Sequence, residues 1–198
     1  ISFDLFSHTH TDEHFEAARW ILDTLDKAGF IEPRVSEEPY DPIAKQFLPD
    51  RYVEGTCPHC DYESARGDQC DNCGKTLDSK ELKNPHPKLN PDAEIEFRET
   101  EHLFFKLSAF RDTLLEWLSS GKEHWRPAVI NFTRNWLQEG LIDRAITRDL
   151  EWGIDIEREG YEKKRMYVWF EAVMGYYSAS LHWAKNQGKP DLWKEWWE

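Results

Sequence analysis

The sequence predicts a mixed α/β fold built around a cysteine-bearing insertion. Three observations support this prediction. Several segments carry apolar residues at helical spacing, aromatic and β-branched runs lie between them, and all four cysteines fall within residues 57–73. A chain of 198 residues is long enough to bury a real core, as one large domain or two small ones.

The charge balance limits which partners the chain can have. The formal net charge is -13, from 38 acidic and 25 basic residues. Neutralising phosphates drives general nucleic-acid binding, so this balance disfavours such a role. No stretch approaches the roughly 18 apolar residues of a membrane span, and no signal peptide opens the sequence. We therefore expect neither a membrane partner nor general nucleic-acid binding.

The first third of the chain predicts one helix followed by turns. Residues 11–28 form an amphipathic pattern with Thr11 as N-cap, and Gly29 ends it. Residues 32–49 contain four prolines and predict a turn-rich segment, and residues 51–53 predict a short strand.

The middle of the chain predicts a loop, a strand and two helices. Residues 78–93 contain three prolines and predict a loop, and residues 94–97 alternate like a strand with one solvated face. Ser108 is expected to cap a helix that ends at Leu118. Pro127 suits the first position of the next helix, which stops at Gly140.

The last third predicts a strand followed by a helix. Residues 143–149 are polar and contain two arginines. Residues 165–170 are aromatic and β-branched, which predicts a largely buried strand, and residues 172–185 continue as a helix.

The cysteines form two Cys-x-x-Cys pairs separated by nine residues. Cys57, Cys60, Cys70 and Cys73 are therefore predicted to hold one structural zinc ion, with Zn–S distances of about 2.3 Å. Four protein ligands close the coordination shell, so the metal would hold a loop together and not catalyse. His59, inside the first pair, is expected to be a bystander.

Two alternatives for the cysteines remain. A pair of disulfides would fit an oxidising compartment, to which nothing else in the sequence points. A redox dithiol needs one Cys-x-x-Cys pair opening a helix after a strand, whereas two pairs lie here in a segment rich in glycine and aspartate.

Five ordered blocks of sequence resemble the methionyl-tRNA synthetase family, and the resemblance runs from residue 1 to residue 198. The blocks are Phe-Leu-Pro-Asp-Arg-Tyr-Val-Glu-Gly-Thr-Cys (47–57), Ala-Arg-Gly-Asp-Gln-Cys-Asp-Asn-Cys-Gly (65–74), Arg-Glu-Thr-Glu-His-Leu-Phe-Phe (98–105), Arg-Ala-Ile-Thr-Arg-Asp-Leu-Glu-Trp-Gly (144–153) and Tyr-Val-Trp-Phe-Glu-Ala-Val-Met-Gly-Tyr (167–176).

The resemblance implies part of a Rossmann-type class I synthetase catalytic domain interrupted by a zinc-knuckle connective-peptide domain. Residues 1–30 would end the first half of the catalytic domain. Residues 31–165 would form the insertion, with the knuckle at residues 57–73, and residues 166–198 would begin the second half.

The resemblance also assigns roles to single residues. Trp169, Ala172 and Tyr176 match positions that line the methionine side-chain pocket, although the two aromatic residues alone would fit an ordinary core. Sulfur–aromatic contacts contribute about 0.3–1.5 kcal/mol, which suits a thioether substrate. Glu171 replaces the more usual aspartate of this motif.

One arginine is a candidate for catalysis. Arg148 matches an arginine that assists adenylate formation, and a fixed guanidinium suits developing phosphate charge. Its alternative is a surface arginine paired with Asp149 or Glu151.

The implied activity is methionine–tRNA ligation in the cytoplasm, with methionine, ATP with Mg2+ and the methionine tRNA as substrates. The family's His-Ile-Gly-His and Lys-Met-Ser-Lys-Ser signatures, which contact ATP, do not occur among the 198 residues. We therefore expect a piece of a larger protein that is inactive alone. The alternative is a non-catalytic zinc-knuckle interaction module derived from the synthetase.

Three histidines near the start of the chain form a weaker candidate site. His8, His10 and His14 have acidic neighbours, which would suit a second metal ion. We expect instead that they are solvated residues at the beginning of a helix.

Overall fold

The computed structural model describes residues 2–197, so Ile1 and Glu198 lie outside the description. These residues form two compact units. Unit 1 comprises the residues up to Pro33, Leu103–Thr147 and the residues from Trp152 onward, and unit 2 comprises Arg34–His102 and Arg148–Glu151. The units group the chain differently from the predicted domain boundaries, which remain a prediction.

Helix α1 (Asp12–Lys27) confirms the predicted first helix in unit 1. The Thr11 side chain accepts a hydrogen bond from the His14 backbone N–H, at 3.2 Å. This satisfies one of the helix's unpaired amide groups. Gly29 follows with a φ of 81°, a left-handed conformation that glycine adopts without steric cost.

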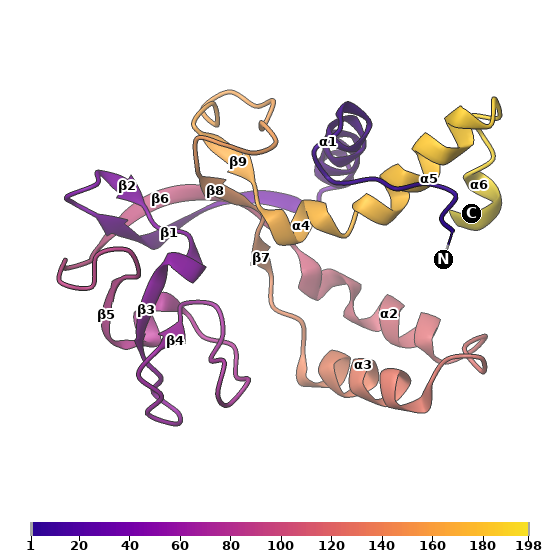
Figure 1. Ribbon diagram of the computed structural model, residues 1–198. Coiled ribbons are helices and arrows are strands. Elements are labelled where there is room, and N and C mark those ends of the chain that lie inside the picture. The colour runs from indigo at the N-terminus through magenta and orange to yellow at the C-terminus, as the bar shows by residue number, and fades with distance from the viewer. Residues whose placement is uncertain (1, 198) are drawn as a thin grey trace. The chain divides into compact units, whose positions relative to one another are not determined.

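Helices α2 (Arg111–Leu118) and α3 (Pro127–Glu139) confirm the two helices predicted for the middle of the chain, and they pack against each other (Figure 1). Pro127 opens α3, as predicted. The cap assigned to Ser108 is wrong, because a 3-10 turn, η3 (Leu107–Phe110), precedes α2. The Ser108 hydroxyl donates instead to Asp143 Oδ1, at 2.6 Å.

Short strands and three helices form the last third of the chain. The predicted strand at residues 165–170 is partly wrong, because β9 (Lys164–Met166) is followed directly by a short helix. At the end of the extended stretch, the Tyr167 N–H donates to the Ile146 carbonyl, at 2.8 Å. The remaining elements are β7 (Arg144–Ala145), β8 (Thr147–Asp149), α4 (Val168–Ala172), α5 (Gly175–Asn186) and α6 (Lys194–Trp197).

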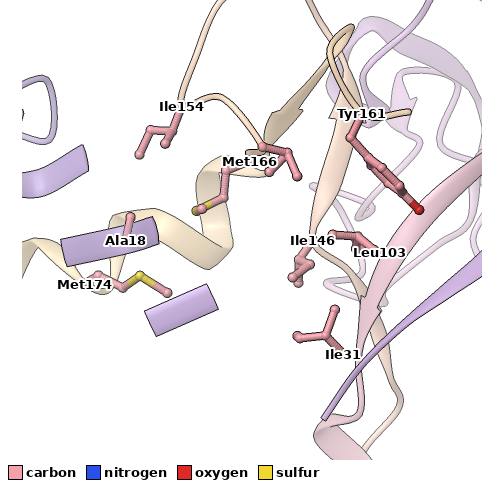
Figure 2. Packing of buried hydrophobic residues seen from close by; sticks show 9 residues of the cluster. Ala18, Ile31, Leu103, Ile146, Ile154, Tyr161, Met166 and Met174 are labelled. Carbon is pink, nitrogen blue, oxygen red and sulfur yellow. The ribbon is translucent and has the colours of Figure 1, made fainter. Parts of the chain in front are cut away.

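The core of unit 1 joins residues from distant parts of the chain. Ala18 from α1 and Met174 from the link between α4 and α5 belong to it (Figure 2). Around them lie further buried side chains, namely Ile31, Leu103, Ile146, Ile154, Ile156, Tyr161 and Met166. Helix α1 also packs against α5, so helical segments from near the two ends of the chain lie side by side in unit 1 (Figure 1).

Unit 2 is built from antiparallel strands. Strand β3 (Val53–Thr56) pairs with both β4 (Ala65–Arg66) and β5 (Lys83–Pro87). Strand β1 (Ile31–Asp41) enters this unit from unit 1 and pairs with β2 (Gln46–Phe47). Strand β6 (Glu96–Phe105), next to β1 in the sheet, extends the short strand predicted at 94–97.

Two proline-rich segments of unit 2 are more regular than predicted. Residues 32–49, predicted as turns, contain β1, and residues 78–93, predicted as a loop, contain the 3-10 turn η2 (Ser79–Glu81) and β5. Proline fixes φ near −65°, which an extended strand accommodates. The predicted strand at 51–53 begins only at Val53, after the 3-10 turn η1 (Asp50–Tyr52).

No helix among residues 2–197 is long and apolar enough to cross a membrane.

Candidate functional site

The four cysteines converge at the end of strand β3 in unit 2. Two matching turns present them: the Asp61 N–H donates to the Cys57 carbonyl at 3.1 Å, and the Gly74 N–H donates to the Cys70 carbonyl at 2.9 Å. Gly74 has a φ of 72°, which explains the glycine at this turn. Each Cys-x-x-Cys pair therefore forms one knuckle of the same kind.

The sulfur atoms have the spacing of a tetrahedral metal site. All four lie within 4.8 Å of one another, with Cys57 and Cys73 Sγ 3.9 Å apart and Cys60 and Cys70 Sγ 3.6 Å apart. A tetrahedron of thiolates at about 2.3 Å from a zinc ion has edges of about 3.8 Å. A disulfide would need about 2.05 Å, so the geometry favours a metal over the disulfide alternative.

Polar groups beside one cysteine of the cluster stabilise its thiolate form. The Asn72 side-chain amide lies 3.5 Å from Cys60 Sγ. Its hydrogen bond, together with the Tyr62 backbone N–H, lowers the pKa of Cys60 to about 6. The His59 backbone N–H donates to Cys57 Sγ at 3.4 Å, while its side chain is exposed and outside the ligand cluster, as predicted. The cluster can therefore hold a metal ion.

The three candidate methionine-pocket residues lie on two neighbouring helices of unit 1. Trp169 belongs to α4, Ala172 ends α4, and Tyr176 lies in the first turn of α5. Trp169 is 56% exposed and Tyr176 is 77% exposed. Neither aromatic side chain is therefore buried in the core of unit 1.

Arg148 lies in unit 2, in a partly buried polar cluster. Its guanidinium contacts Asp50 Oδ2 at 3.1 Å, with 15% of the side chain exposed. Next to it in sequence, Asp149 lies 3.5 Å from the buried His102 Nε2. Burial raises the pKa of the neighbouring Glu38. The ion pair is thus with Asp50, and the surface alternative, in which Arg148 pairs with Asp149 or Glu151, did not anticipate it.

A buried polar cluster in unit 1 was missed by the sequence analysis. His14 is fully buried, which corrects the expectation that it is a solvated residue; His8 and His10 are exposed. His14 Nε2 lies 2.7 Å from Glu171 Oε2, and His14 Nδ1 lies 2.9 Å from Ser178 Oγ. The partners are 157 and 164 residues away in sequence, so no local pattern could connect them.

A family model described as "tRNA synthetases class I (M)" matches residues 1–198. The chain belongs to this family. The model covers every residue, so membership applies to both compact units, including the cysteine cluster and the α4–α5 surface.

Curated proteins that are similar to the whole chain share the name methionine–tRNA ligase. Proteins named methionine–tRNA ligase from Thermomicrobium roseum and Dehalococcoides mccartyi are each 53% identical to it over 197 residues. The match covers 100% of this chain but 33% and 35% of those relatives. This class I synthetase chain therefore spans about a third of the length of the curated relatives it matches.

Solved structures confirm the class I synthetase fold. The chain is similar to Mycobacterium tuberculosis methionyl-tRNA synthetase in complex with methionyl-adenylate, with a TM-score of 0.59 and 21% identity. The similarity covers 91% of this chain and 30% of that one. The apo form of the same enzyme gives a TM-score of 0.57. At this identity the likeness shows the fold alone, and it bears out the predicted mixed α/β class.

Proposed function

We propose that this chain is part of an enzyme that joins methionine to its tRNA. The observation that carries the proposal is the 53% identity, across the whole chain, to relatives named methionine–tRNA ligase. The reaction has two steps. The methionine carboxylate attacks the α-phosphate of ATP and pyrophosphate leaves; the methionyl group then passes to the terminal ribose of the tRNA and AMP leaves.

In this proposal the surface of α4 and α5 binds the methionine side chain. Trp169 and Tyr176 present exposed aromatic rings, which suit a thioether. Ala172 lies between them in sequence and has a small side chain, which leaves room for the substrate. A lone exposed aromatic residue is common on protein surfaces, but two on adjacent helices at family-matched positions support a binding role.

Arg148 is proposed to stabilise negative charge on the phosphate during adenylate formation. A guanidinium stays charged and can form two parallel hydrogen bonds to phosphate oxygens. Its contact with Asp50 would hold the side chain in a fixed orientation. Such pre-ordering is what electrostatic stabilisation of a transition state requires.

Cys57, Cys60, Cys70 and Cys73 are proposed to hold one zinc ion. The all-sulfur ligand set and its tetrahedral spacing suit zinc. Bound zinc would fix the loops of unit 2, and its closed shell would leave no position for substrate. ATP would enter with Mg2+, and the enzyme is proposed to work in the cytoplasm.

The chain on its own is proposed to be inactive. Neither ATP-contacting signature of the family occurs among its 198 residues. The isolated chain is therefore expected to show no methionine-dependent exchange of pyrophosphate into ATP. Detectable exchange by the purified chain would contradict this part of the proposal.

The test of the proposed function is ATP–pyrophosphate exchange by the complete protein that contains this chain. Methionine is compared with leucine, isoleucine and homocysteine, and the metal content of each preparation is measured. We expect strong exchange with methionine and weak exchange with the others. A folded, zinc-loaded protein that shows no exchange would instead support the non-catalytic interaction module.

A further inference from the structure

The buried His14 connects two helices that the chain itself joins by only a short link. Glu171, which accepts from Nε2, lies on α4, whereas Ser178, which contacts Nδ1, lies on α5. Only residues 173 and 174 separate the two helices. Each ring nitrogen of His14 therefore holds one side of the α4–α5 junction.

The buried side of this junction is packed and hydrogen-bonded. Met174, between the helices, is packed in the same core as Ala18 of α1 (Figure 2). The Ser178 hydroxyl also lies 3.2 Å from the Gly175 carbonyl, so the polar network reaches the first residue of α5. A buried polar group that loses its partner costs free energy, so the network favours one arrangement of the two helices.

The same two helices carry the proposed methionine pocket on their exposed side. Glu171 directly precedes Ala172, and Ser178 follows Tyr176 by two residues. Successive residues of a helix point about 100° apart, so an inward-facing Glu171 allows Trp169 and Ala172 to face elsewhere. A shift of α4 relative to α5 would change the separation of Trp169 and Tyr176.

We propose that His14 is a positioning residue for methionine binding. By bonding Glu171 and Ser178 at once, it fixes the angle between α4 and α5 and so the distance between the two pocket aromatics. This inference rests on the proposed function. It assigns a role to the glutamate that replaces the more usual aspartate: its extra methylene gives the carboxylate the length to reach His14.

The test uses the complete synthetase that contains this chain, carrying His14→Ala, Glu171→Gln or Ser178→Ala. Methionine KM, ATP KM and kcat are measured by pyrophosphate exchange. We expect the methionine KM to rise about tenfold or more in His14→Ala, since small misplacements of binding groups are costly, while the ATP KM changes by less than about twofold. Ser178→Ala should give a smaller rise.

Two further variants separate positioning from loss of stability. Leu103→Ala shortens a side chain of the same core that is only 1% exposed. The Leu103 side chain is apolar, so it takes no part in the hydrogen bonds of His14. Leu103→Ala should lower stability and leave the methionine KM nearly unchanged. His14→Gln keeps a donor at the Nε2 position toward Glu171, so it should restore much of the methionine affinity lost in His14→Ala.

The outcomes are distinct. A methionine KM that stays within about twofold in all three variants, or rises equally in Leu103→Ala, would overturn the positioning role. If His14→Ala does not fold, Glu171→Gln and Ser178→Ala, which nearly preserve side-chain size, decide the question in the same way. A wild-type protein with no methionine-dependent exchange would contradict the proposed function itself.

Discussion

The partly buried cysteine cluster of unit 2 and the buried His14 cluster of unit 1 are both groups of polar side chains, but they are built in opposite ways. The cysteines lie within 17 residues of sequence and are presented by two matching turns. His14 meets Glu171 and Ser178 across 157 and 164 residues. The first cluster has a sequence motif and the second has none.

The difference follows from what holds each cluster together. Metal ligands must converge within a few ångströms, and short chain segments achieve this at a low cost in loop entropy. A hydrogen-bonded cluster between distant helices depends on the whole core around it. The stability of unit 2 should therefore depend on the proposed zinc ion, and that of the α4–α5 surface on the packing of the core.

The largest expected effect is the loss of a metal ligand. Cys57→Ser should abolish zinc binding and destabilise unit 2 by several kcal/mol, because metal binding and folding are coupled in such sites. Metal content and amide hydrogen exchange of residues 53–87 measure the change. The matched control is His59→Ala in the first knuckle, which should keep both metal and protection. Equal metal loss in the two variants would contradict the four-cysteine site.

The next effect is breaking the buried pair of unit 1. Glu171→Ala should lower stability by about 3–5 kcal/mol, because it leaves His14 Nε2 buried without its hydrogen-bond partner and opens a cavity beside it. Hydrogen exchange of α1, α4 and α5 reports the loss. The double variant His14→Leu with Glu171→Met should lose less stability than His14→Leu alone or Glu171→Met alone. If the stability loss of the double variant equals the sum of the losses of the two single variants, the pair is not coupled.

A close backbone approach gives a smaller effect in unit 2. A Cβ at Gly67 would collide with Ser79 Oγ and lie 2.8 Å from the Asp50 carbonyl oxygen. Gly67→Ala should therefore cost about 1–3 kcal/mol, like other overpacking substitutions. Thermal unfolding measures it, and Gly67→Ala with Ser79→Gly should recover part of the loss. No recovery in the double variant would mean that the Asp50 carbonyl, and not Ser79, sets the cost.

The smallest effect is expected at an exposed ion pair. Lys27 Nζ lies 2.6 Å from Asp23 Oδ2 on α1, with side chains 76% and 56% exposed. Lys27→Ala should change stability by less than about 0.5 kcal/mol, since solvent screens such pairs. A free energy of unfolding, measured by chemical denaturation, that changes by more than about 1 kcal/mol would contradict the contrast with the buried pair.

Local signals predicted the parts of the structure that depend on local chemistry. Thr11, Pro127 and the Cys-x-x-Cys spacing act within one turn or loop, and the structure bears out the helices and the cluster that they predict. The prolines of residues 32–49 gave a wrong prediction because a strand tolerates proline wherever its backbone N–H is not needed for pairing.

The errors at His14 and residues 165–170 have one physical cause. Each region makes tertiary contacts that no local pattern shows: His14 bonds to partners on α4 and α5, and the Tyr167 N–H donates to the distant Ile146 carbonyl. The available signal for burial was the spacing of His14, which lies three and four residues before the buried Ala17 and Ala18 and so on the same face of α1. It is a weak signal without knowledge of the partner.

The most direct test of the account compares two exposed tryptophans of unit 1 in the complete synthetase. Trp169 on α4 is 56% exposed, and Trp136 on α3 is 51% exposed. If α4 and α5 bind the methionine side chain, Trp169→Ala should raise the methionine KM about tenfold or more, and Trp136→Ala should leave it within about twofold. The same methionine KM in both variants would contradict the assignment of this surface to methionine.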